Sequence, residues 1–354
     1  MFQPKFAITP RILGNLTEIA EIKAIVERSK VLPQREALLR RKAVIKIAHT
    51  STSIEGNVLQ EFEVEKVLGG QKILAKENQI KEVKNLEKAL AEVNKLAENK
   101  KTFDVKNILK IHRLVINGLV EPKKCGAFRP GNVFVVNEIE KKEQIVYTAP
   151  KAKEVPQLVN ELCHWAKKAH AENEPHPILA AGLLHYQFAT IHPFTDGNGR
   201  VTRLLTQLYL YQNNHDFRKI LVLENYYNQN RQAYFAVLQT GETYPSREGA
   251  DLTGWLEYFT NGFLFEARQV KEQIFSIGFQ KELATTDQVL LSRDEIKLMD
   301  FAATMGQIKS PGVAEILSIP LRTAQAKLKE LTDKGLLAKR GKGPASHYVL
   351  KSSY

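Results

Sequence analysis

Apolar residues recur at helical spacing through most of the chain. Residues 35–49, "REALLRRKAVIKIAH", have the pattern of an amphipathic helix, and the "TSTSIEGN" that follows reaches Gly56-Asn57, a pair typical of a helix end. Segment 104–120, "DVKNILKIHRLVINGLV", repeats the pattern and carries Gly118 as a stop signal. Residues 1–100 are therefore predicted to form a helical region that leads into further helices.

The pattern changes after Pro122. "NVFVV" (132–136) and "EQIVYT" (143–148) are rich in β-branched and aromatic residues and are separated by a charged turn, which predicts a β-hairpin. Helical spacing then returns and continues to about residue 276. The predicted helices cover 155–169, 177–192, a segment that begins near Gly199, 228–239 and 251–274. The fold class expected from this pattern is mainly α.

The last stretch, residues 285–354, is organised differently. It opens with Ser292 and Glu295 in capping-box spacing. Three helices are predicted, over 292–303, 310–319 and 321–335, and two short strands within "LLAKRGKGPASHYVL". Three helices followed by a hairpin are the outline of a winged helix-turn-helix domain.

Length and charge narrow the class of protein. The 354 residues are enough for two or three domains. Lys and Arg number 51 against 39 Asp and Glu, and this net charge of +12 favours anionic partners such as nucleotides or nucleic acid. No apolar run reaches the roughly 18 residues that a membrane helix needs, and "MFQPKFAITPRILGN" has charges where a signal peptide is apolar. We therefore expect a cytoplasmic protein without membrane contact.

The segment "HPFTDGNGR" (192–200) lies between one predicted helix and the next. Gly197 and Gly199 adopt positive φ freely and Asn198 tolerates it, so successive backbone N–H groups can converge on an anion. The helix that begins there adds its own unpaired N–H groups and the positive end of its dipole. This loop is therefore expected to bind a di- or triphosphate.

The side chains around the loop suit the same ligand. Asp196 offers a hard oxygen to Mg²⁺, and Arg200 and Arg203 share a helix face from which they can hold outer phosphates. His192, whose ordinary pKa lies near neutrality, can accept a proton from an incoming hydroxyl. These groups together predict a site for nucleotidyl or phosphoryl transfer.

The stretch "HPFTDGNGRVTR" matches every fixed position of the pattern HPFx[D/E]GNGRxxR and so resembles the Fic family, whose typical members transfer AMP from ATP to protein hydroxyls. The resemblance implies that His192 is the general base and Asp196 the Mg²⁺ ligand. It also implies that the backbone from Gly197 to Gly199 holds the α- and β-phosphates, with Arg200 on the outer phosphates and Arg203 on the γ-phosphate.

The likeness extends over residues 101–276, the expected catalytic core, through "EVPQLVNELCHW" and "CGAFRPGNVFV". By this resemblance, the hairpin within 130–150 is a flap that holds a target segment in extended form by main-chain hydrogen bonds. The flap residues in question are Asn132, Val133, Phe134 and Val135. "NRQAYFAVL" resembles the helix that lines the base, which suggests Tyr234 and Leu238 for the adenine pocket, with ordinary core packing as the alternative.

An acid upstream of the core raises a second expectation. Ser51-x-x-x-Glu55-Gly56 resembles the inhibitory motif [S/T]xxxE[G/N] found in a large class of Fic proteins. By that likeness Glu55 pairs with Arg203 and takes the place of the γ-phosphate, while Ser51 caps a short helix over 51–56 or bonds Glu55. The same carboxylate could instead position a water that hydrolyses an AMP ester, so de-AMPylation is the second interpretation.

The C-terminal unit has its own expectation. Residues 287–351 hold eleven Lys and Arg against seven Asp and Glu, a surplus of four. In the helix after Pro320, Leu321, Leu328 and Leu331 are expected to pack inward, and DNA contacts are expected from Arg322, Gln325, Lys329, Arg340 and Lys342. Winged helices also serve as dimer or protein docking units.

Taken together, the sequence predicts a self-inhibited, Mg²⁺-dependent protein adenylyltransferase. Its expected substrates are ATP and a Ser, Thr or Tyr hydroxyl of a target protein, which includes the enzyme itself. A homodimer of apposed cores is a further expectation. The rival hypothesis is a transcription regulator in which the Fic fold only senses a ligand.

Overall fold

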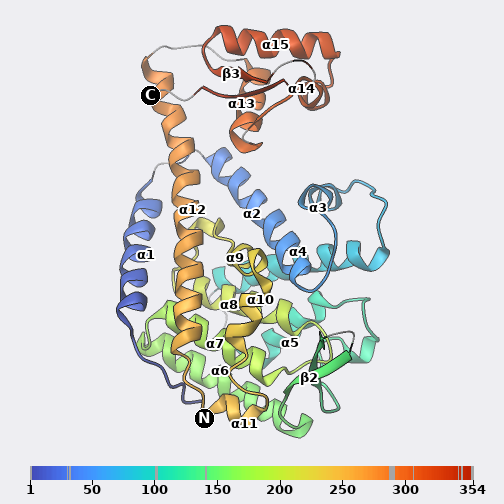
Figure 1. Cartoon of the computed structure of the whole chain (residues 1–354), viewed down its shortest axis with the longest axis vertical. Coiled ribbons are helices and arrows are strands. Elements are labelled where there is room, and N and C mark those ends of the chain that lie inside the picture. Colours follow the sequence, from blue (N-terminus) through green and yellow to red (C-terminus); the bar gives the residue numbers. More distant parts are fainter. Residues whose placement is uncertain are drawn as a thin grey trace. The chain divides into compact units, whose positions relative to one another are not determined.

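The computed structural model describes residues 2–29, 31, 33–99, 103–139, 142–286, 292–305, 307–341, 343 and 346–351. The chain is mainly helical, as predicted, and its strands are short (Figure 1). It divides into two compact units, Met1–Ile274 and Phe275–Tyr354, with the boundary inside helix α12 (Thr253–Thr286). Among the described residues, no helix is both long and apolar enough to cross a bilayer.

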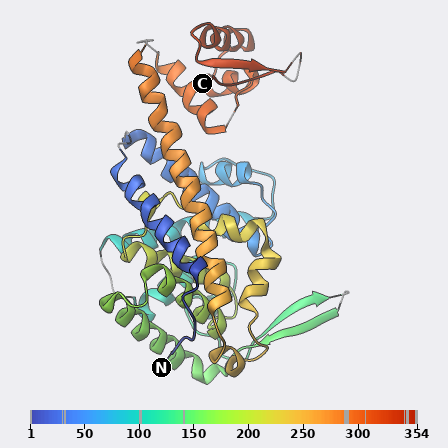
Figure 2. The same cartoon turned by 60° about the vertical axis from the view of Figure 1, so that its left-hand side comes forward.

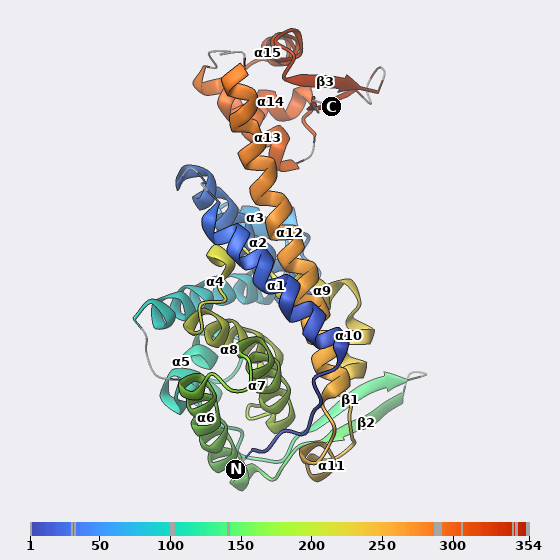
Figure 3. The ribbon, with the colours of Figure 1, turned by 90° about the vertical axis from the view of Figure 1, so that its left-hand side faces the viewer.

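The N-terminal helices belong to the first unit. They are α1 (Pro10–Arg28), α2 (Pro33–Ile54), α3 (Glu61–Leu68) and α4 (Glu77–Glu98). Helix α1 lies alongside α12, where Thr9 donates to Glu257 and Asn15 to Thr260 (Figure 3). Helix α2 runs five residues beyond the predicted 35–49, so Ser51 lies in its last turns. The short helix predicted over 51–56 is therefore the end of α2 over residues 51–54, and Glu55 and Gly56 follow it as a turn.

Two central helices form the core of this unit. Of the fifteen residues of α7 (Pro177–Ile191), all except Ala189 are buried, and α8 (Asn198–Gln212) is buried along most of its length. A helix that is apolar all round needs neighbours on every side. Those neighbours are α4, α5 (Val105–Val115), α6 (Val155–Glu172), α11 (Tyr244–Glu248) and α12.

The predicted hairpin is present and projects from the unit (Figure 2). Strands β1 (Phe134–Ile139) and β2 (Lys142–Thr148) pair antiparallel, with a register shift between Val135 and Val136. Tyr147 anchors the hairpin, because its hydroxyl donates to the carbonyl of Thr190 at 2.6 Å and its ring lies 3.6 Å from the guanidinium of Arg247. The flap base is thereby attached to α7.

The helix predicted over 228–239 is present but is interrupted at Asn230. The segment divides into α9 (Leu223–Gln229) and α10 (Arg231–Leu238) at Asn230, whose backbone is non-helical at φ −143° and ψ 80°. Its side chain accepts the N–H of Ala233 and so caps α10. Asn interrupts helices in this way because its amide competes for backbone hydrogen bonds. Short 3-10 helices η1 (Pro122–Lys124), η2 (Ala152–Glu154) and η3 (Phe217–Lys219) complete the unit.

The second unit has the predicted order of elements. Helices α13 (Arg293–Met305), α14 (Ser310–Leu317) and α15 (Leu321–Asp333) precede β3 (Leu337–Arg340) and β4 (His347–Leu350). Ala324, Leu328 and Leu331 of α15 are fully buried in its core. Leu321 was expected there, but it is 49% exposed, because it is the first residue of α15 and the buried stripe begins one turn later.

We predict that Leu184→Ala lowers the free energy of unfolding of the first unit by about 2–5 kcal/mol, because it leaves a cavity in the fully buried α7. Chemical denaturation followed by tryptophan fluorescence measures this, since both tryptophans, Trp165 and Trp255, lie in that unit. Leu74→Ala is the control, because Leu74 is fully exposed. Equal losses for the two variants would contradict the assignment of α7 as the core helix.

Candidate active site

The loop between α7 and α8 is held by its own side chains. His192 ends α7 in the left-handed region, at φ 50° and ψ 59°, and Gly197 precedes α8 at φ 82°. The amide of Asn198 closes the loop, since its Oδ1 accepts from the N–H of Phe194 at 2.9 Å and its Nδ2 donates to the carbonyl of Phe194 at 2.8 Å. The side chain of Asn198 is thus used within the loop, and only its backbone is available to a ligand.

Gly197 is required by two independent constraints. Its φ is positive, and a Cβ at this position would lie 2.7 Å from Cγ2 of Ile116 on the neighbouring α5 segment. Any other residue would therefore displace the loop. The turn delivers the chain directly into α8, whose first N–H groups have no partners within the helix. The positive end of the helix dipole thus faces the loop, as an anion site needs.

His192 is set up as a proton acceptor. Burial lowers the pKa of His192 to about 4, and the cations of Arg129 and Arg247 act in the same direction, against the opposing effect of Glu55. Its imidazole is therefore neutral at physiological pH and keeps a free lone pair.

The two arginines of α8 have N–H donors that lack hydrogen-bond acceptors within the described part of the chain. Arg200 and Arg203 are 3% and 2% exposed, yet Nε and Nη1 of Arg200 and Nη1 of Arg203 make no hydrogen bond within the part of the chain that the structure describes. Burying a cationic donor without an acceptor is costly. These orphaned N–H groups, beside a helix N-terminus, fit phosphate oxygens.

Glu55 occupies this anion site. Its Oε1 accepts from Nη2 of Arg203 at 2.8 Å, and a Cβ on Gly199 would lie only 2.3 Å from the same oxygen. The carboxylate therefore lies directly against the first turn of α8. Burial raises the pKa of Glu55, but Arg203 and Arg200 together lower it below the ordinary carboxyl value, so Glu55 is ionised.

Ser51 contributes differently from the prediction. It neither caps a short helix nor bonds Glu55. Its Oγ accepts from Nε of Arg203, and its carbonyl accepts from Nη2, each at 2.9 Å. The reason is that Ser51 lies in the last turns of α2 and Glu55 directly after its end, four positions apart, and both face Arg203. The guanidinium is therefore clamped by a hydroxyl, a carbonyl and a carboxylate of these two residues.

Two more contacts fix the end of α2. Arg231, the first residue of α10, donates to Oγ of Ser53 at 2.7 Å. The amide of Asn57 donates to Glu82 of α4 at 2.8 Å, and the other oxygen of Glu82 lies 3.8 Å from Nη1 of Arg200. The turn that carries Glu55 is thus attached both to α10 and to α4.

Asp196 lies at the exposed edge of the loop. Its Oδ1 accepts from the N–H of Gly197 at 2.5 Å and from Nη2 of Arg200 at 3.0 Å. Among the described residues no group of three His, Cys, Asp or Glu gathers to hold a metal. One carboxylate fits Mg²⁺ only when phosphates and waters supply the remaining ligands, which is how Mg²⁺ usually accompanies a nucleotide.

His112 also holds the loop and was not among the residues predicted from the sequence. Its ring stacks on Phe194 with centroids 3.6 Å apart, its Nε2 bonds the carbonyl of Asp196 at 3.1 Å, and its Nδ1 accepts from the N–H of Gly126. Burial lowers the pKa of His112 to about 4, so the ring is neutral and Nε2 carries its proton. Nothing in the sequence distinguishes His112 from other residues on the buried face of α5.

The residues suggested for the adenine pocket lie in different surroundings. Tyr234 is 2% exposed, its hydroxyl bonds Nε2 of His185 at 2.8 Å, and its ring stacks on Tyr227. It is therefore a core residue, as the alternative interpretation held. Leu238, at the end of α10, is half-buried. Its contact with a base stays a prediction.

The flap residues are accessible. Asn132 is exposed and accepts the N–H of Ala152, while Phe134 is 52% exposed. Val133 and Val135 are half-buried. Within the described residues β1 pairs only with β2, so its outer edge is open to another strand.

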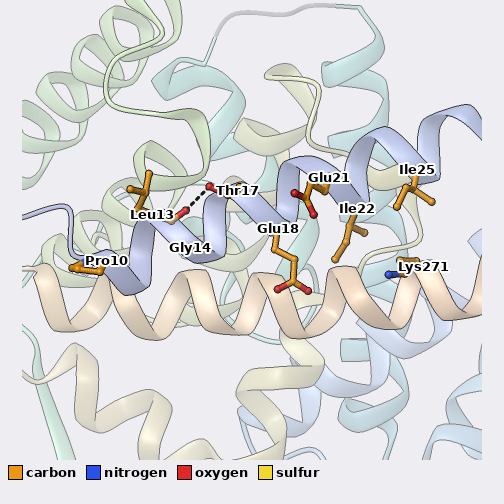
Figure 4. A pocket seen from close by; sticks show the side chains of 9 residues that line it. All are labelled: Pro10, Leu13, Gly14, Thr17, Glu18, Glu21, Ile22, Ile25 and Lys271. Atoms are coloured by element: carbon orange, nitrogen blue, oxygen red, sulfur yellow. Dashed lines mark hydrogen bonds between the residues drawn. The ribbon is translucent and has the colours of Figure 1, made fainter.

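Two other cavities lie away from the loop. A groove of about 560 Å³ between α1 and α12 is lined by Leu13, Glu18, Ile25 and Lys271, among others (Figure 4). It contains none of the residues discussed above. A small cavity of about 20 Å³, lined by both polar and apolar side chains, lies behind Arg203, against His185, and has room for about one water.

Comparison with known proteins agrees with this geometry. The profile of the Fic/DOC family matches residues 102–210, which include the loop and most of α8. A Fic family protein from Desulfovibrio desulfuricans G20 has a solved structure that covers 100% of this chain and 99% of its own, at 26% identity and a TM-score of 0.64. Over residues 102–210 the chain is therefore similar to the Fic/DOC family, and over its whole length it is similar in fold to a solved Fic family protein.

Two further proteins are similar to this chain, one in fold and one in sequence. A Fic domain protein from Bacteroides thetaiotaomicron shares the fold over 74% of this chain and 96% of its own, at 20% identity and a TM-score of 0.62. "Protein adenylyltransferase Fic" of Nematostella vectensis is 30% identical over 213 residues, 55% of this chain. The chain spans 46% of that relative.

We predict that His112→Phe keeps the stack on Phe194 but lowers the free energy of unfolding by about 1–3 kcal/mol, because the N–H of Gly126 and the carbonyl of Asp196 lose their partner. Chemical denaturation measures the loss. His164→Phe is the control, since His164 is exposed on α6. If His112→Phe were as stable as the control, the ring would not be holding the loop.

Proposed function

We propose that this Fic protein transfers AMP from ATP to a hydroxyl side chain of a protein, and that Glu55 holds it in an inhibited state. The observation that carries the proposal is the set of unpartnered donors of Arg200 and Arg203, at the start of α8 and in the same loop as a neutral His192. The name of the Nematostella relative supports the same activity.

The chemistry follows from these groups. The lone pair of His192 takes the proton of a Ser, Thr or Tyr hydroxyl, and the hydroxyl oxygen forms a bond to the α-phosphorus of ATP. The bond from that phosphorus to the bridging oxygen of the β-phosphate breaks, and pyrophosphate leaves. The N–H groups of α8 and the two arginines hold the phosphates in line. Asp196 and the phosphates would hold Mg²⁺, which would supply neutralisation of the charge on the leaving group.

Glu55 opposes this reaction in two ways. It neutralises Arg203, and its carboxylate occupies the space against Gly199 that an anion would take. Nucleotide phosphates in that space would meet the negative charge of Glu55 across a partly buried site, where repulsion is strong. The carboxylate has to move away before ATP can bind productively.

We also propose that the open edge of β1 receives the target segment. Main-chain hydrogen bonds from an exposed edge hold an extended peptide whatever its sequence. Phe134, exposed on β1, offers an apolar contact to such a segment.

We predict that Glu55→Gly raises the incorporation of AMP from α-labelled ATP severalfold or more, because Arg203 becomes free for phosphate. His192→Ala abolishes incorporation in either background, since the proton acceptor is lost. The assay uses the full chain with Mg²⁺ and a cell lysate, and labelled protein is resolved on a gel. Glu65→Gln, an exposed carboxylate on α3, is the control and leaves incorporation unchanged. Equal labelling with and without Glu55 would remove the inhibitory role.

We propose a second function for the C-terminal unit, which is to bind DNA. Arg322, Gln325 and Lys329 are exposed on one face of α15, opposite the buried Leu328 and Leu331. The spacing i, i+3 and i+7 places the three side chains along one side of the helix, as in a recognition helix that lies in the major groove of DNA. Arg340 is exposed on β3, while Lys342 lies outside the described residues.

We predict that the affinity for duplex DNA falls steeply with salt, with a slope of about −0.9 for each phosphate contacted. Arg322→Ala and Lys329→Ala weaken DNA binding at low salt. If the replaced residue contacts a phosphate, the slope of log affinity against log salt becomes shallower by about one. Fluorescence anisotropy across a salt series measures both quantities. Lys297→Ala, an exposed lysine on α13, is the control. Absence of binding at low salt would end this proposal.

A further inference from the structure

Arg129 is a buried cation that bonds only main-chain carbonyls. It is 3% exposed, and among the described residues no carboxylate lies within ion-pair distance of it. Its Nε donates to the carbonyl of His192 at 2.9 Å, its Nη1 to Gly131 at 2.9 Å and its Nη2 to Pro150 at 2.5 Å. Burial lowers the pKa of Arg129 below its ordinary value, which is still far above neutrality, so the group is charged.

Each of the three acceptors has a distinct place in the fold. Gly131 precedes β1 and Pro150 follows β2, so two of the bonds end at the two roots of the flap. The third ends at His192 itself, whose backbone is in the left-handed region. The N–H of Arg129 also donates to the carbonyl of Pro193 at 3.0 Å. One planar group therefore joins the flap to the residue that accepts the proton.

Only a guanidinium can make this junction. Its donors lie in a fixed plane and point in several directions at once, whereas an ammonium is a single point on a flexible stem. The charge of Arg129 also acts on the imidazole of His192. The other charged groups that act on this ring are Glu55 and Arg247, of which Glu55 has the opposite effect.

We propose that Arg129 is a positioning residue, which fixes the backbone of His192 and both roots of the flap as one unit, so that a target strand on β1 is presented to the imidazole in a fixed geometry. The inference deepens the proposed AMP transfer, and its expected effect on kinetics rests on that function. The expected effects on the His192 titration and on amide exchange do not depend on it.

The test uses the full chain with Arg129→Gln and Arg129→Lys. Histidine side-chain NMR gives the titration midpoint of His192, assigned with His192→Ala, and amide exchange reports the flap root at Ala149, whose N–H donates to the carbonyl of Val133. Arg129→Gln raises the midpoint by about one pH unit, because a cation near the ring is lost. Arg129→Lys keeps the charge and leaves the midpoint low.

Both variants speed exchange at Ala149 by about tenfold or more, because breaking the junction costs at least about 1.4 kcal/mol.

Kinetics add a third reading. In the Glu55→Gly background, both variants lower AMP incorporation about tenfold or more, chiefly in kcat, because His192 and the flap no longer share one geometry. If Glu55→Gly itself incorporates no AMP, the proposed function fails. The NMR and amide-exchange measurements still test the positioning role of Arg129.

The matched control is Arg218→Gln. Arg218 also donates to several main-chain carbonyls, those of Val26, Glu27 and Ser29, but it lies at η3, away from the loop. The Arg218→Gln variant leaves the titration midpoint of His192 and the amide exchange rate of Ala149 unchanged. Thermal melts show that each variant is folded, and if Arg129→Gln does not fold, Arg129→Lys still carries the exchange and kinetic tests. A folded Arg129 variant with the exchange rate of the unmodified protein at Ala149 would overturn the proposal.

Discussion

The structure of the site depends on positive charge that is buried without a full set of partners. The start of α8 points unpaired N–H groups at the loop, and Arg200 and Arg203 add cationic donors that are almost inaccessible to water. Such an arrangement is unfavourable unless an anion completes it. The burial that makes the donors costly also strengthens their attraction for an anion, since water no longer screens it. The site is therefore complementary to a strongly charged ligand before any ligand arrives.

Glu55 is the anion that the chain itself supplies. It lies in the turn that follows α2, 148 residues before Arg203, and Ser51 of α2 adds a hydroxyl and a carbonyl to the clamp. Removing a carboxylate from such a pair leaves a buried cation uncompensated, so the site is stable only when Glu55 or another anion is present. The proposed inhibition and the proposed phosphate binding would then be two uses of one electrostatic constraint. The links from Ser53 to Arg231 and from Asn57 to Glu82 attach the end of α2 and the turn after it to α10 and α4.

The loop geometry rests on side chains that bond main-chain atoms. Asn198 closes the turn on Phe194, His112 holds the carbonyl of Asp196, and Arg129 holds that of His192. None of these three side chains offers chemistry to a substrate in this arrangement. They keep the backbone in a conformation that includes left-handed residues and would otherwise relax. In the proposed reaction this support would place the proton acceptor precisely relative to the phosphate, because catalysis loses efficiency when groups shift by about 1 Å.

The sequence by itself determined the helices, the hairpin and the identity of the loop. Amphipathic spacing is local, and the need for glycine at position 197 can be read from neighbours in the chain, so the fold class and the group from His192 to Arg203 were predictable. The break at Asn230 was not predicted, because apolar spacing does not show whether a side chain or a backbone carbonyl will accept a helix N–H. Here the side chain of Asn230 accepts the N–H of Ala233. Tertiary structure alone decided which distant residues meet. The contact of Glu55 with Gly199, the three bonds of Arg129 and the burial of Tyr234 depend on the packing of elements far apart in sequence, and local periodicity holds no information about such distances.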